Sequence, residues 1–260
     1  MKPPVALTIA GSDSGGGAGI QADLKTFAAL GVHGTSAITA ITAQNTETVT
    51  EILELPVSMI RAQIDAVFAD LHPTAVKTGM LSSPEIIGCV ASYRLRSLVV
   101  DPVMVAKGGA RLLRDDAVGV LRSRLLPLAA VLTPNIPEAE VLLGRSIATL
   151  DDRRAAARDL LALGPRAVIV KGGHAEGDAI DVYWDGTELV ELIATRIETA
   201  NTHGSGCAFS AAIAARLAAG RAPIDAVRDA KQFITNAIEF ALELGHGHGP
   251  VNPMFGAGSG

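Results

Sequence analysis

The sequence is poor in the features that define several large classes of protein. Its 260 residues include only two cysteines, Cys89 and Cys207, which are too few for a disulfide framework and lack the spacing of zinc ligands. No uninterrupted apolar run reaches the roughly 18 residues that a membrane-spanning helix requires. Lysine and arginine form no block that could supply a nucleic-acid surface, and the net charge is −5. We therefore expect neither membrane insertion nor binding to nucleic acid.

The composition instead favours a large hydrophobic core. Hydrophobic residues make up 48% of the chain and charged residues 19%, a balance that argues against intrinsic disorder. The apolar segment that starts at Val5 runs directly into a glycine loop without a small-residue cleavage site, so we expect no signal peptide and a cytoplasmic protein. No linker divides the chain, which predicts a single domain over residues 1–260, with a frayed tail at about residues 251–260.

Short apolar runs alternate with amphipathic stretches along the chain. This alternation predicts an α/β fold with a mostly parallel central sheet, helices on both faces and a small antiparallel addition. Ser83 before Pro84 predicts a helix start, and Asp185-Gly186 predicts the turn of a hairpin. We expect strands at Val5–Ala10, Gly34–Thr39, Ala75–Thr78, Leu98–Val100, Ala129–Leu132, Ala167–Val170, Asp181–Trp184 and Leu189–Ile193. We expect helices at Ile20–Leu30, Val57–Asp70, Pro84–Arg94, Asp115–Arg124, Pro137–Leu143, Asp151–Leu163, Ala208–Ala219 and Pro223–Leu244.

The first strand is followed by a loop with five glycines between Gly11 and Gly19. Glycines allow positive φ angles and a close approach of the backbone to a ligand, and a tight turn alone would need fewer of them. The stretch from Gly17 to Ala22 fits the G-x-G-x-x-A pattern of dinucleotide sites, but no acidic residue ends a second strand at the required distance. A Walker A lysine is also missing. The loop therefore predicts ligand contact without defining a ligand.

A second loop precedes the first of the two long C-terminal helices. Gly204-Ser205-Gly206 at a helix start leaves backbone N–H groups unpaired at the positive end of the helix dipole, which suits an anion or a phosphate. Cys207 falls in the first helical turn, where the dipole is expected to lower the pKa of its thiol. From its position, Cys207 could be a nucleophile, a general base or an inert filler, whereas Cys89 is expected in the core.

Two further strand exits carry polar groups. Asn135 and Glu138 start a helix after a strand, and their oxygens suit a water-rich Mg²⁺ site. The same pair also fits a helix N-cap with an acid that complements the dipole, and the two interpretations are compatible. Lys171 follows another strand and could serve as a point charge for phosphate. Since the carboxyl ends of parallel strands share one sheet edge, these residues predict a phosphate-handling α/β enzyme.

Taken together, the motifs closely resemble the hydroxymethylpyrimidine/phosphomethylpyrimidine kinases of thiamin biosynthesis, in the ribokinase-like superfamily. The resemblance extends through Gly245–Pro250, nearly the whole chain, with the motifs in the same order. One departure is Ser205, which stands where the family commonly has threonine and keeps the hydroxyl. The matching motifs are Ile9–Lys25, Ala43–Thr46, Lys77–Leu81, Asp101–Met104, Thr133–Glu138, Lys171–His174 and Asn201–Cys207.

The resemblance implies a three-layer α/β/α fold and two successive ATP-dependent phosphorylations. The first would phosphorylate 4-amino-5-hydroxymethyl-2-methylpyrimidine, and the second would convert the monophosphate to the diphosphate. It also implies Mg²⁺ and a homodimer. The implied pyrimidine pocket contains Gly11, Asp23, Gln44, Met80 and Val103. The implied catalytic turn is Gly204, Ser205, Gly206 and Cys207, with Cys207 as the base; Lys171, Thr202 and Asn135 would contact the nucleotide, and Glu138 with Asn135 would organise the metal, through water.

Three points stay open at this level. A pyridoxal kinase or a dual-specificity enzyme shares the expected fold, and a non-catalytic ligand-binding relative is a further alternative. Lys231 and Asn236 are weak candidates for the adenine pocket, and His203 could act in the site or brace its loop. The glycines in Lys107–Arg114 would suit a flap over the site.

Overall fold

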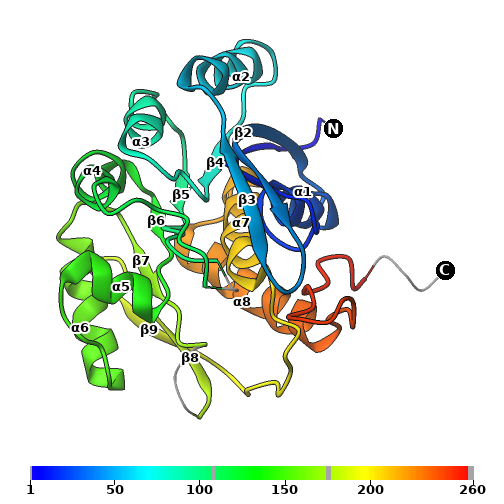
Figure 1. The fold of residues 1–260 in the computed structure, drawn as a ribbon. Coiled ribbons are helices and arrows are strands. Elements are labelled where there is room, and N and C mark those ends of the chain that lie inside the picture. The colour runs from blue at the N-terminus through cyan, green and yellow to red at the C-terminus, as the bar shows by residue number, and fades with distance from the viewer. Residues whose placement is uncertain (1, 107–108, 174–176, 257–260) are drawn as a thin grey trace.

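A single mixed sheet forms the centre of the molecule in the computed structural model, which describes residues 2–106, 109–173 and 177–256. Within these residues, nine strands lie in the order β3-β2-β1-β4-β5-β6-β7-β8-β9 (Figure 1). The six neighbouring strands in the middle of this order, β2, β1, β4, β5, β6 and β7, are parallel to one another. At one edge β3 pairs antiparallel with β2, and at the other β8 and β9 add antiparallel pairs. The strands are β1 Val5–Asp13, β2 His33–Gln44, β3 Val49–Glu54, β4 Ala75–Thr78, β5 Leu98–Val100, β6 Val131–Leu132, β7 Val168–Val170, β8 Ala179–Trp184 and β9 Leu189–Ala194.

Helices cover both faces of this sheet, which makes three layers. One face carries α1 Gly19–Ala29, α7 Ser205–Ala218 and α8 Pro223–Glu239, and α7 contacts the central strands directly. The opposite face carries α2 Val57–Asp70, α3 Pro84–Ala91, α4 Ala117–Val120, α5 Ile136–Leu143 and α6 Leu150–Leu161 (Figure 1). Short turns at Leu121–Leu125 and Leu126–Leu128 continue α4. The predicted α/β fold with three layers is confirmed.

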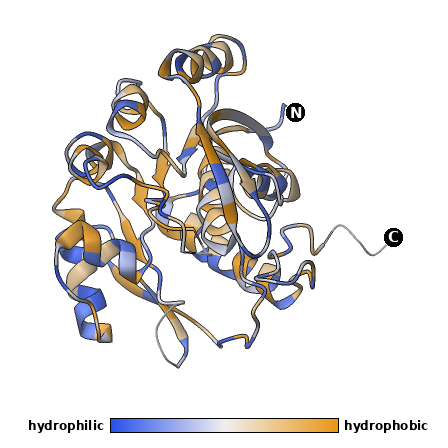
Figure 2. Cartoon of the chain, viewed as in Figure 1, coloured by the Kyte–Doolittle hydropathy of each residue, from blue (hydrophilic) through white to orange (hydrophobic). Residues whose placement is uncertain are grey.

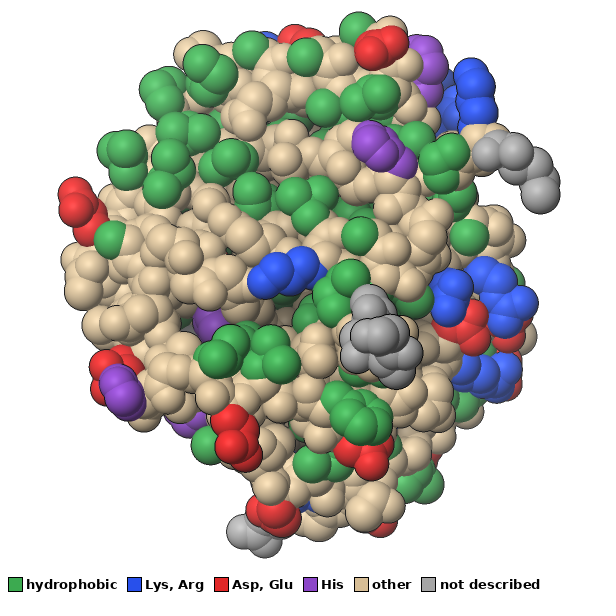
Figure 3. All heavy atoms as spheres, turned by 90° about the vertical axis from the view of Figure 1, so that its right-hand side faces the viewer, with side chains coloured by type: hydrophobic (Ala, Val, Ile, Leu, Met, Phe, Trp, Pro, Cys, Tyr) green, Lys and Arg blue, Asp and Glu red, His purple; other side chains and the backbone are tan. Residues whose placement is uncertain are grey.

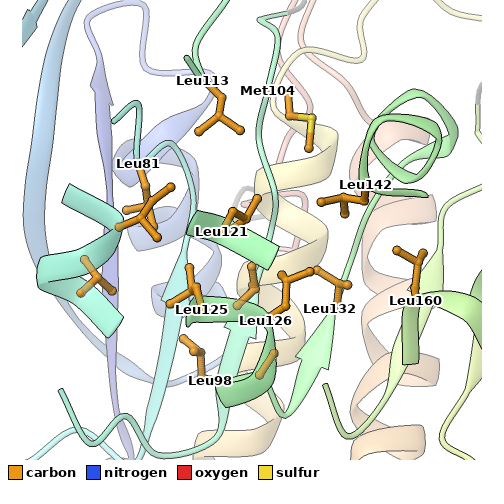
Figure 4. Close-up of a cluster of buried hydrophobic side chains, with 14 of the residues drawn as sticks. Leu81, Leu98, Met104, Leu113, Leu121, Leu125, Leu126, Leu132, Leu142 and Leu160 are labelled. Carbon is orange, nitrogen blue, oxygen red and sulfur yellow. The ribbon is translucent and has the colours of Figure 1, made fainter. Parts of the chain in front are cut away.

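Alternation along the buried strands builds two hydrophobic clusters, one on each face. In β1, Leu7 packs toward the layer of α2 to α6, and Ala6 packs toward α7. Figure 4 shows leucine side chains from strands and helices converging in the first cluster, among them Leu98, Leu125 and Leu132. In Figure 2 the central strands are mostly hydrophobic, whereas hydrophilic residues mark the outer turns of α6. The burial on both faces explains why these strands read as unbroken apolar runs.

Some helices and strands could be predicted from the local sequence pattern, and others could not. Ser83 caps α3, because its hydroxyl accepts a hydrogen bond from the N–H of Ile86, and the hairpin of β8 and β9 forms as predicted. Strand β3 was missed. Most of its residues are exposed, since it is an edge strand that pairs only with β2, and its sequence therefore has no buried periodicity. Helix α8 ends at Glu239, earlier than the predicted Leu244.

The segment after Pro250 is not frayed over residues 251–256, contrary to the prediction. Val251 is 2% exposed, and its N–H donates to the carbonyl of His203. Phe255 stacks with Phe240 and lies tilted against Phe233, at centroid distances of 6.2 and 5.4 Å. These aromatic contacts tie the segment to α8. The rest of the predicted tail, residues 257–260, lies outside the described residues.

The described helices include none that is both long and apolar enough to cross a membrane. On the face drawn in Figure 3, basic and acidic side chains lie intermingled at one edge, and hydrophobic side chains are scattered among polar ones. Mixed charge of this kind gives no broad field of one sign on that face.

Candidate active site

A cavity of about 750 Å³ lies along the carboxyl edge of the parallel strands. It runs from the end of β2 to β9 and passes over the start of α7, so one continuous space joins two ends of the sheet. Open parallel sheets bind ligands at this edge, because successive strand exits place their loops together there. The cavity has room for two small ligands side by side across the start of α7.

The α7 turn, residues 204–207, occupies the middle of the cavity. Gly204 precedes the helix with a φ of +78°, and a Cβ there would overlap the carbonyl oxygen of Gly17. The N–H of Ser205 donates to the Thr202 carbonyl at 3.2 Å, whereas the N–H groups of Gly206 and Cys207 have no partner among the described residues. Thr202 also lines the cavity. Two free amides at the positive end of a 14-residue helix give the arrangement on which the prediction of an anion site depends.

Cys207 lies in the first turn of α7, as predicted, but its thiol is not acidified. Burial raises the pKa of Cys207 to about 11, with Asp23 and Asp101 adding to the shift, and these effects outweigh Lys77 and the Gly19 N–H, both of which lower it. The expectation that the helix dipole lowers this pKa is therefore wrong. The position in the helix favours the thiolate, but the surrounding protein removes water that would stabilise the charge.

Asp23 does not line the cavity, which corrects its predicted place in the pyrimidine pocket. Its carboxylate is fully buried, accepts hydrogen bonds from Lys77 Nζ at 2.8 and 3.0 Å, and accepts a third from Thr8 Oγ1 at 2.6 Å. Lys77 does line the cavity. Burial alone would lower the pKa of Lys77, but the Asp23 carboxylate, together with Cys207 and Asp101, raises it above its usual value. Asp23 thus holds a charged lysine against the site.

The other four residues of the predicted pyrimidine pocket do meet at one end of the cavity. Gly11, Gln44, Met80 and Val103 all line it. A Cβ at Gly11 would lie 3.1 Å from the sulfur of Met80, so glycine leaves room for that sulfur at the wall. The side chains combine an amide with an apolar surface, which suits a flat heteroaromatic ring with polar edges.

A charged cluster lies beside the α7 turn. Lys171 Nζ is 3.0 Å from Asp101 Oδ1, and a Cβ at Gly206 would lie 3.3 Å from Lys171 Nζ. Lys171 therefore lies at the α7 turn, where the sequence placed a phosphate contact. Glu138 also lines the cavity, and burial raises its pKa to about 7, with Lys171 opposing and Asp101 adding to the shift.

Asn135 and Glu138 form a capping box at the start of α5. The Asn135 N–H donates to Glu138 Oε2, and the Glu138 N–H donates to Asn135 Oδ1, both at 2.8 Å. The capping interpretation is confirmed. Both residues also line the cavity. The described residues contain no group of three or more His, Cys, Asp or Glu side chains placed to hold a metal by themselves.

Asp13 organises the glycine loop, a role that the sequence analysis missed. Its carboxylate accepts the N–H groups of Gly15, Gly17 and Ala18 at 2.8 to 3.1 Å and a hydrogen bond from His203 at 2.9 Å. Burial would raise the pKa of Asp13, but the hydrogen bonds from His203, Ala18 and Gly15 hold it below the usual value. The sequence did contain one indication of this role, because Asp13 is an acidic residue at the point where a strand meets a glycine loop.

The far end of the cavity lies against β8, β9 and α8. Lys231 lines it and is held by Asp181 at 2.8 Å and the carbonyl of Ala179 at 3.0 Å, while Ile234 adds an apolar wall. Asn236 does not line the cavity; it accepts a hydrogen bond from Gln232. Of the two weak candidates for the adenine pocket, the structure therefore retains Lys231 alone.

The predicted flap and one predicted motif fall partly outside the described residues. Residues 107 and 108 of the flap and His174 of the Lys171–His174 motif are among those not described. Ala106 lines the cavity, and its N–H donates to the Ala110 carbonyl at 2.8 Å.

The C-terminal strap, residues 245–251, joins the two ligand-facing loops. A Cβ at Gly245 or Gly247 would overlap Thr46, and one at Gly249 would overlap Asn201. The N–H of Gly247 donates to Thr46 Oγ1 at 3.2 Å. Thr46 lies two residues from Gln44, and Asn201 lies in the loop before α7. Because these glycines have no side chain, the strap packs closely against both Thr46 and the loop before α7.

Gly247→Ala should lower the free energy of unfolding by about 1–3 kcal/mol, because the added methyl group must displace the backbone of Thr46. Urea denaturation would measure the change. Gly119→Ala is the matched control, since a Cβ at Gly119 meets nothing within 4 Å. Similar free energies for the two variants would show that the strap is not tightly packed.

The family comparison agrees with this geometry. A family model described as Phosphomethylpyrimidine kinase matches residues 13–252. The chain belongs to the phosphomethylpyrimidine kinase family. The hydroxymethylpyrimidine/phosphomethylpyrimidine kinase of Bacillus subtilis is 51% identical over 253 residues, covering 95% of this chain and 93% of that protein. The thiamine biosynthesis bifunctional protein ThiED of Geobacter sulfurreducens is 53% identical over 256 residues, but the chain spans only 52% of that relative.

Solved structures of kinases share the fold over nearly the whole chain. A pyridoxal kinase of Bacillus subtilis in complex with ADP superposes with a TM-score of 0.92 at 40% identity, covering 99% of this chain and 100% of the other. A phosphomethylpyrimidine kinase of Clostridium difficile gives a TM-score of 0.81 at 46% identity, covering 91% and 100%. The expected ribokinase-like fold is therefore confirmed, and the family resemblance read from the motifs is confirmed with it.

Proposed function

We propose that this kinase phosphorylates 4-amino-5-hydroxymethyl-2-methylpyrimidine and then its monophosphate, using ATP, in thiamin biosynthesis. The observation that carries the proposal is the single cavity in which the pocket of Gly11, Gln44, Met80 and Val103 meets the unpaired amides of the α7 turn. Relatives that are about half identical bear the names of both activities.

At the acceptor end, Gln44 would hydrogen-bond the ring edge, since an amide both donates and accepts. Met80 and Val103 would cover the ring faces, and Gly11 would leave room for the Met80 sulfur against the ring. The hydroxymethyl group would then face Cys207. Asp23 would act at a distance, by keeping Lys77 charged next to the thiol.

Phosphoryl transfer needs alignment and stabilisation of negative charge spread over the transferred group. The N–H groups of Gly206 and Cys207 would hold those oxygens, with Gly204 and Ser205 setting the direction of the turn. Lys171 would neutralise charge beside them, and Thr202 would contact the phosphates. The Cys207 sulfur would accept the hydroxyl proton late in the first transfer.

The nucleotide would take the end of the cavity at α8, where Lys231 and Ile234 line the wall. The related pyridoxal kinase forms a complex with ADP, which supports the use of a nucleotide. A magnesium ion suits the oxygens of Asn135 and Glu138 bound through water, because Glu138 is an acid whose pKa of about 7 a nearby cation would lower. When bound, Mg²⁺ would offset the phosphate charge. We also propose a single cytoplasmic domain that forms a homodimer.

Pyridoxal phosphorylation is a second candidate, because the ADP-bound pyridoxal kinase shares the fold at a TM-score of 0.92. One polar contact in a pocket often discriminates incompletely between similar rings. A non-catalytic binder is a poorer fit, since it would need no base beside an anion site.

The test is a product-resolved assay with ATP and Mg²⁺. The pyrimidine alcohol should be converted to the monophosphate and then to the diphosphate, with pyridoxal as the competing acceptor. Preferential turnover of pyridoxal would replace the proposal with the second candidate, and ATP binding without acceptor-dependent turnover would favour the binder.

A further inference from the structure

Asp101 is a buried acid at the exit of β5 that the proposed mechanism leaves without a role. It is 2% exposed and lines the cavity. Its backbone is fixed by the sheet, because its N–H donates to the carbonyl of Thr78 at the end of β4. Its side chain accepts hydrogen bonds from three other parts of the chain, Thr133 after β6, Lys171 after β7 and Ser210 on α7. One carboxylate thus connects the exits of three parallel strands with the helix that carries the anion site.

The two oxygens of this carboxylate have separate partners. Oδ1 accepts from Lys171 Nζ at 3.0 Å and from Thr133 Oγ1 at 3.2 Å, and Oδ2 accepts from Ser210 Oγ at 3.1 Å. The Ser210 hydroxyl also lies 3.0 Å from the carbonyls of Gly206 and Cys207, which accept backbone N–H groups within α7. The charged carboxylate is the strongest of these acceptors, so it takes the single hydroxyl hydrogen. The acid is therefore tied to the first turn of α7 as well as to the lysine.

Lys171 is the partner that faces the proposed phosphate site. Its backbone is held beside α5, because its N–H donates to the carbonyl of Pro134 at 2.8 Å. A Cβ at Gly206 would lie 3.3 Å from Lys171 Nζ and 3.9 Å from Asp101 Oδ2, so the ion pair lies directly beside the α7 turn. Within the part of the chain that the structure describes, Asp101 is the one hydrogen-bond acceptor of Nζ. Two N–H groups of the ammonium group therefore remain for a ligand.

Two acids compete for this lysine. Burial alone would lower the pKa of Lys171, but Asp101 and then Glu138 raise it above its usual value. Only Asp101 hydrogen-bonds Nζ among the described residues, whereas Glu138 accepts the N–H of Asn135. A lysine side chain is flexible, so the acid that binds the ammonium group determines its position. Asp101 therefore keeps the ammonium group beside the α7 turn.

We propose that Asp101 is a positioning residue that holds the Lys171 ammonium group against the α7 turn, so that lysine and amides receive the transferred phosphoryl group together. The inference rests on the proposed function of Lys171 and the α7 turn in phosphoryl transfer. The transferred group is the same in both reactions, so loss of the acid should slow both by the same factor. A general base, in contrast, serves only the reaction with the alcohol acceptor.

Asp101→Asn keeps the shape of the side chain and removes its charge. It should lower kcat by about 10- to 100-fold in both reactions, the effect of losing a hydrogen bond to a charged group, with little change in KM for either acceptor. Action through Cys207 would have the opposite sign. Burial raises the pKa of Cys207 and Asp101 adds to that rise, so loss of the acid would speed the first reaction at neutral pH and leave the second unchanged. Asp159→Asn, at an exposed acid on α6 paired with Arg145, is the control and should alter neither reaction.

A double-mutant cycle with Lys171→Met separates action through Lys171 from general loosening of the site. If Asp101 acts through Lys171, the variant with both substitutions should have the same kcat as Lys171→Met alone. Losses that multiply, or a loss confined to one reaction, would overturn the inference.

Ser210→Ala decides the matter if Asp101→Asn does not fold. It removes one hydrogen bond to the carboxylate and keeps both charges of the ion pair. It should lower kcat of both reactions by about two- to tenfold, with no further loss when it is combined with Lys171→Met. An unchanged kcat, or a further loss in the Lys171→Met background, would then overturn the inference.

The proposed function has a separate readout. Because Lys171 would act on the phosphoryl group, Asp101→Asn should lower kcat by the same factor with pyridoxal as the acceptor. A wild-type protein that prefers pyridoxal would overturn the proposed function, while an equal factor with that acceptor would still support the role of Asp101. A wild-type protein without acceptor-dependent turnover would overturn both.

Discussion

Replacing Cys207 with alanine should slow the first phosphorylation by about 100- to 10,000-fold, the usual range for loss of a general base, and the second by far less. The two reactions differ in their acceptors. The alcohol must lose a proton during transfer, whereas the phosphate of the monophosphate is already ionised. The effect should appear in kcat when the two products are resolved separately by chromatography.

The pH dependence gives an independent check on Cys207. Because burial raises the pKa of its thiol to about 11, the thiolate is a minor species at neutral pH. The first reaction should therefore accelerate with pH, by about tenfold per unit between pH 7 and 9, as the fraction of thiolate grows. Cys207→Ala should abolish that slope.

Cys89→Ala provides the matched control, since Cys89 is a buried cysteine on α3 that does not line the cavity. It should leave the ratio of the two reactions unchanged. Equal, small losses in both reactions for Cys207→Ala would contradict the role of the thiol as a base and leave only the backbone amides of the α7 turn as catalytic groups.

The location of the site was predictable from sequence, because parallel strands deliver their carboxyl ends to one edge. Glycine loops, Asn135 and Lys171 each follow a buried apolar run, so the order of elements alone brings them together. The hairpin of β8 and β9 was predictable from its Asp185-Gly186 turn. Prediction from sequence fails for β3, whose exposed edge position leaves no hydrophobic pattern to detect.

The pKa shifts and ion pairs of the site could not be predicted from the sequence, because they depend on the groups that surround a residue in space. Position in a helix suggested an acidic Cys207, but the packing of the sheet and α1 around it reverses the shift. Asp23 likewise matched a family motif, yet its buried side chain pairs with Lys77 and does not line the cavity. The partners of Asp23, Lys77 and Thr8, are 54 and 15 residues distant in the chain, so no local pattern reveals them.

Lys77→Met should lower the free energy of unfolding by about 3–5 kcal/mol, because it leaves the Asp23 carboxylate buried without its counter-ion. Burial raises the pKa of Asp23, and removal of the lysine should raise it further. The neutral acid is then favoured in the folded state, so the loss should be smallest below the pKa of the unfolded chain, near pH 4, and grow as pH rises. Urea denaturation at pH 4 and pH 8 would measure both effects.

The double variant Asp23→Leu/Lys77→Met tests whether the pair serves stability or chemistry. Replacing both charges with apolar groups should recover most of the free energy of unfolding, since no buried charge is left unpaired. The first phosphorylation should be slower than in the wild type. Lys77 lowers the pKa of Cys207 more than Asp23 raises it, so loss of both moves the pH profile further to the alkaline side. Arg111→Met, in the exposed pair with Asp115, should change neither property. A double variant that regains both stability and the wild-type pH profile would show that Lys77 has no influence on the thiol.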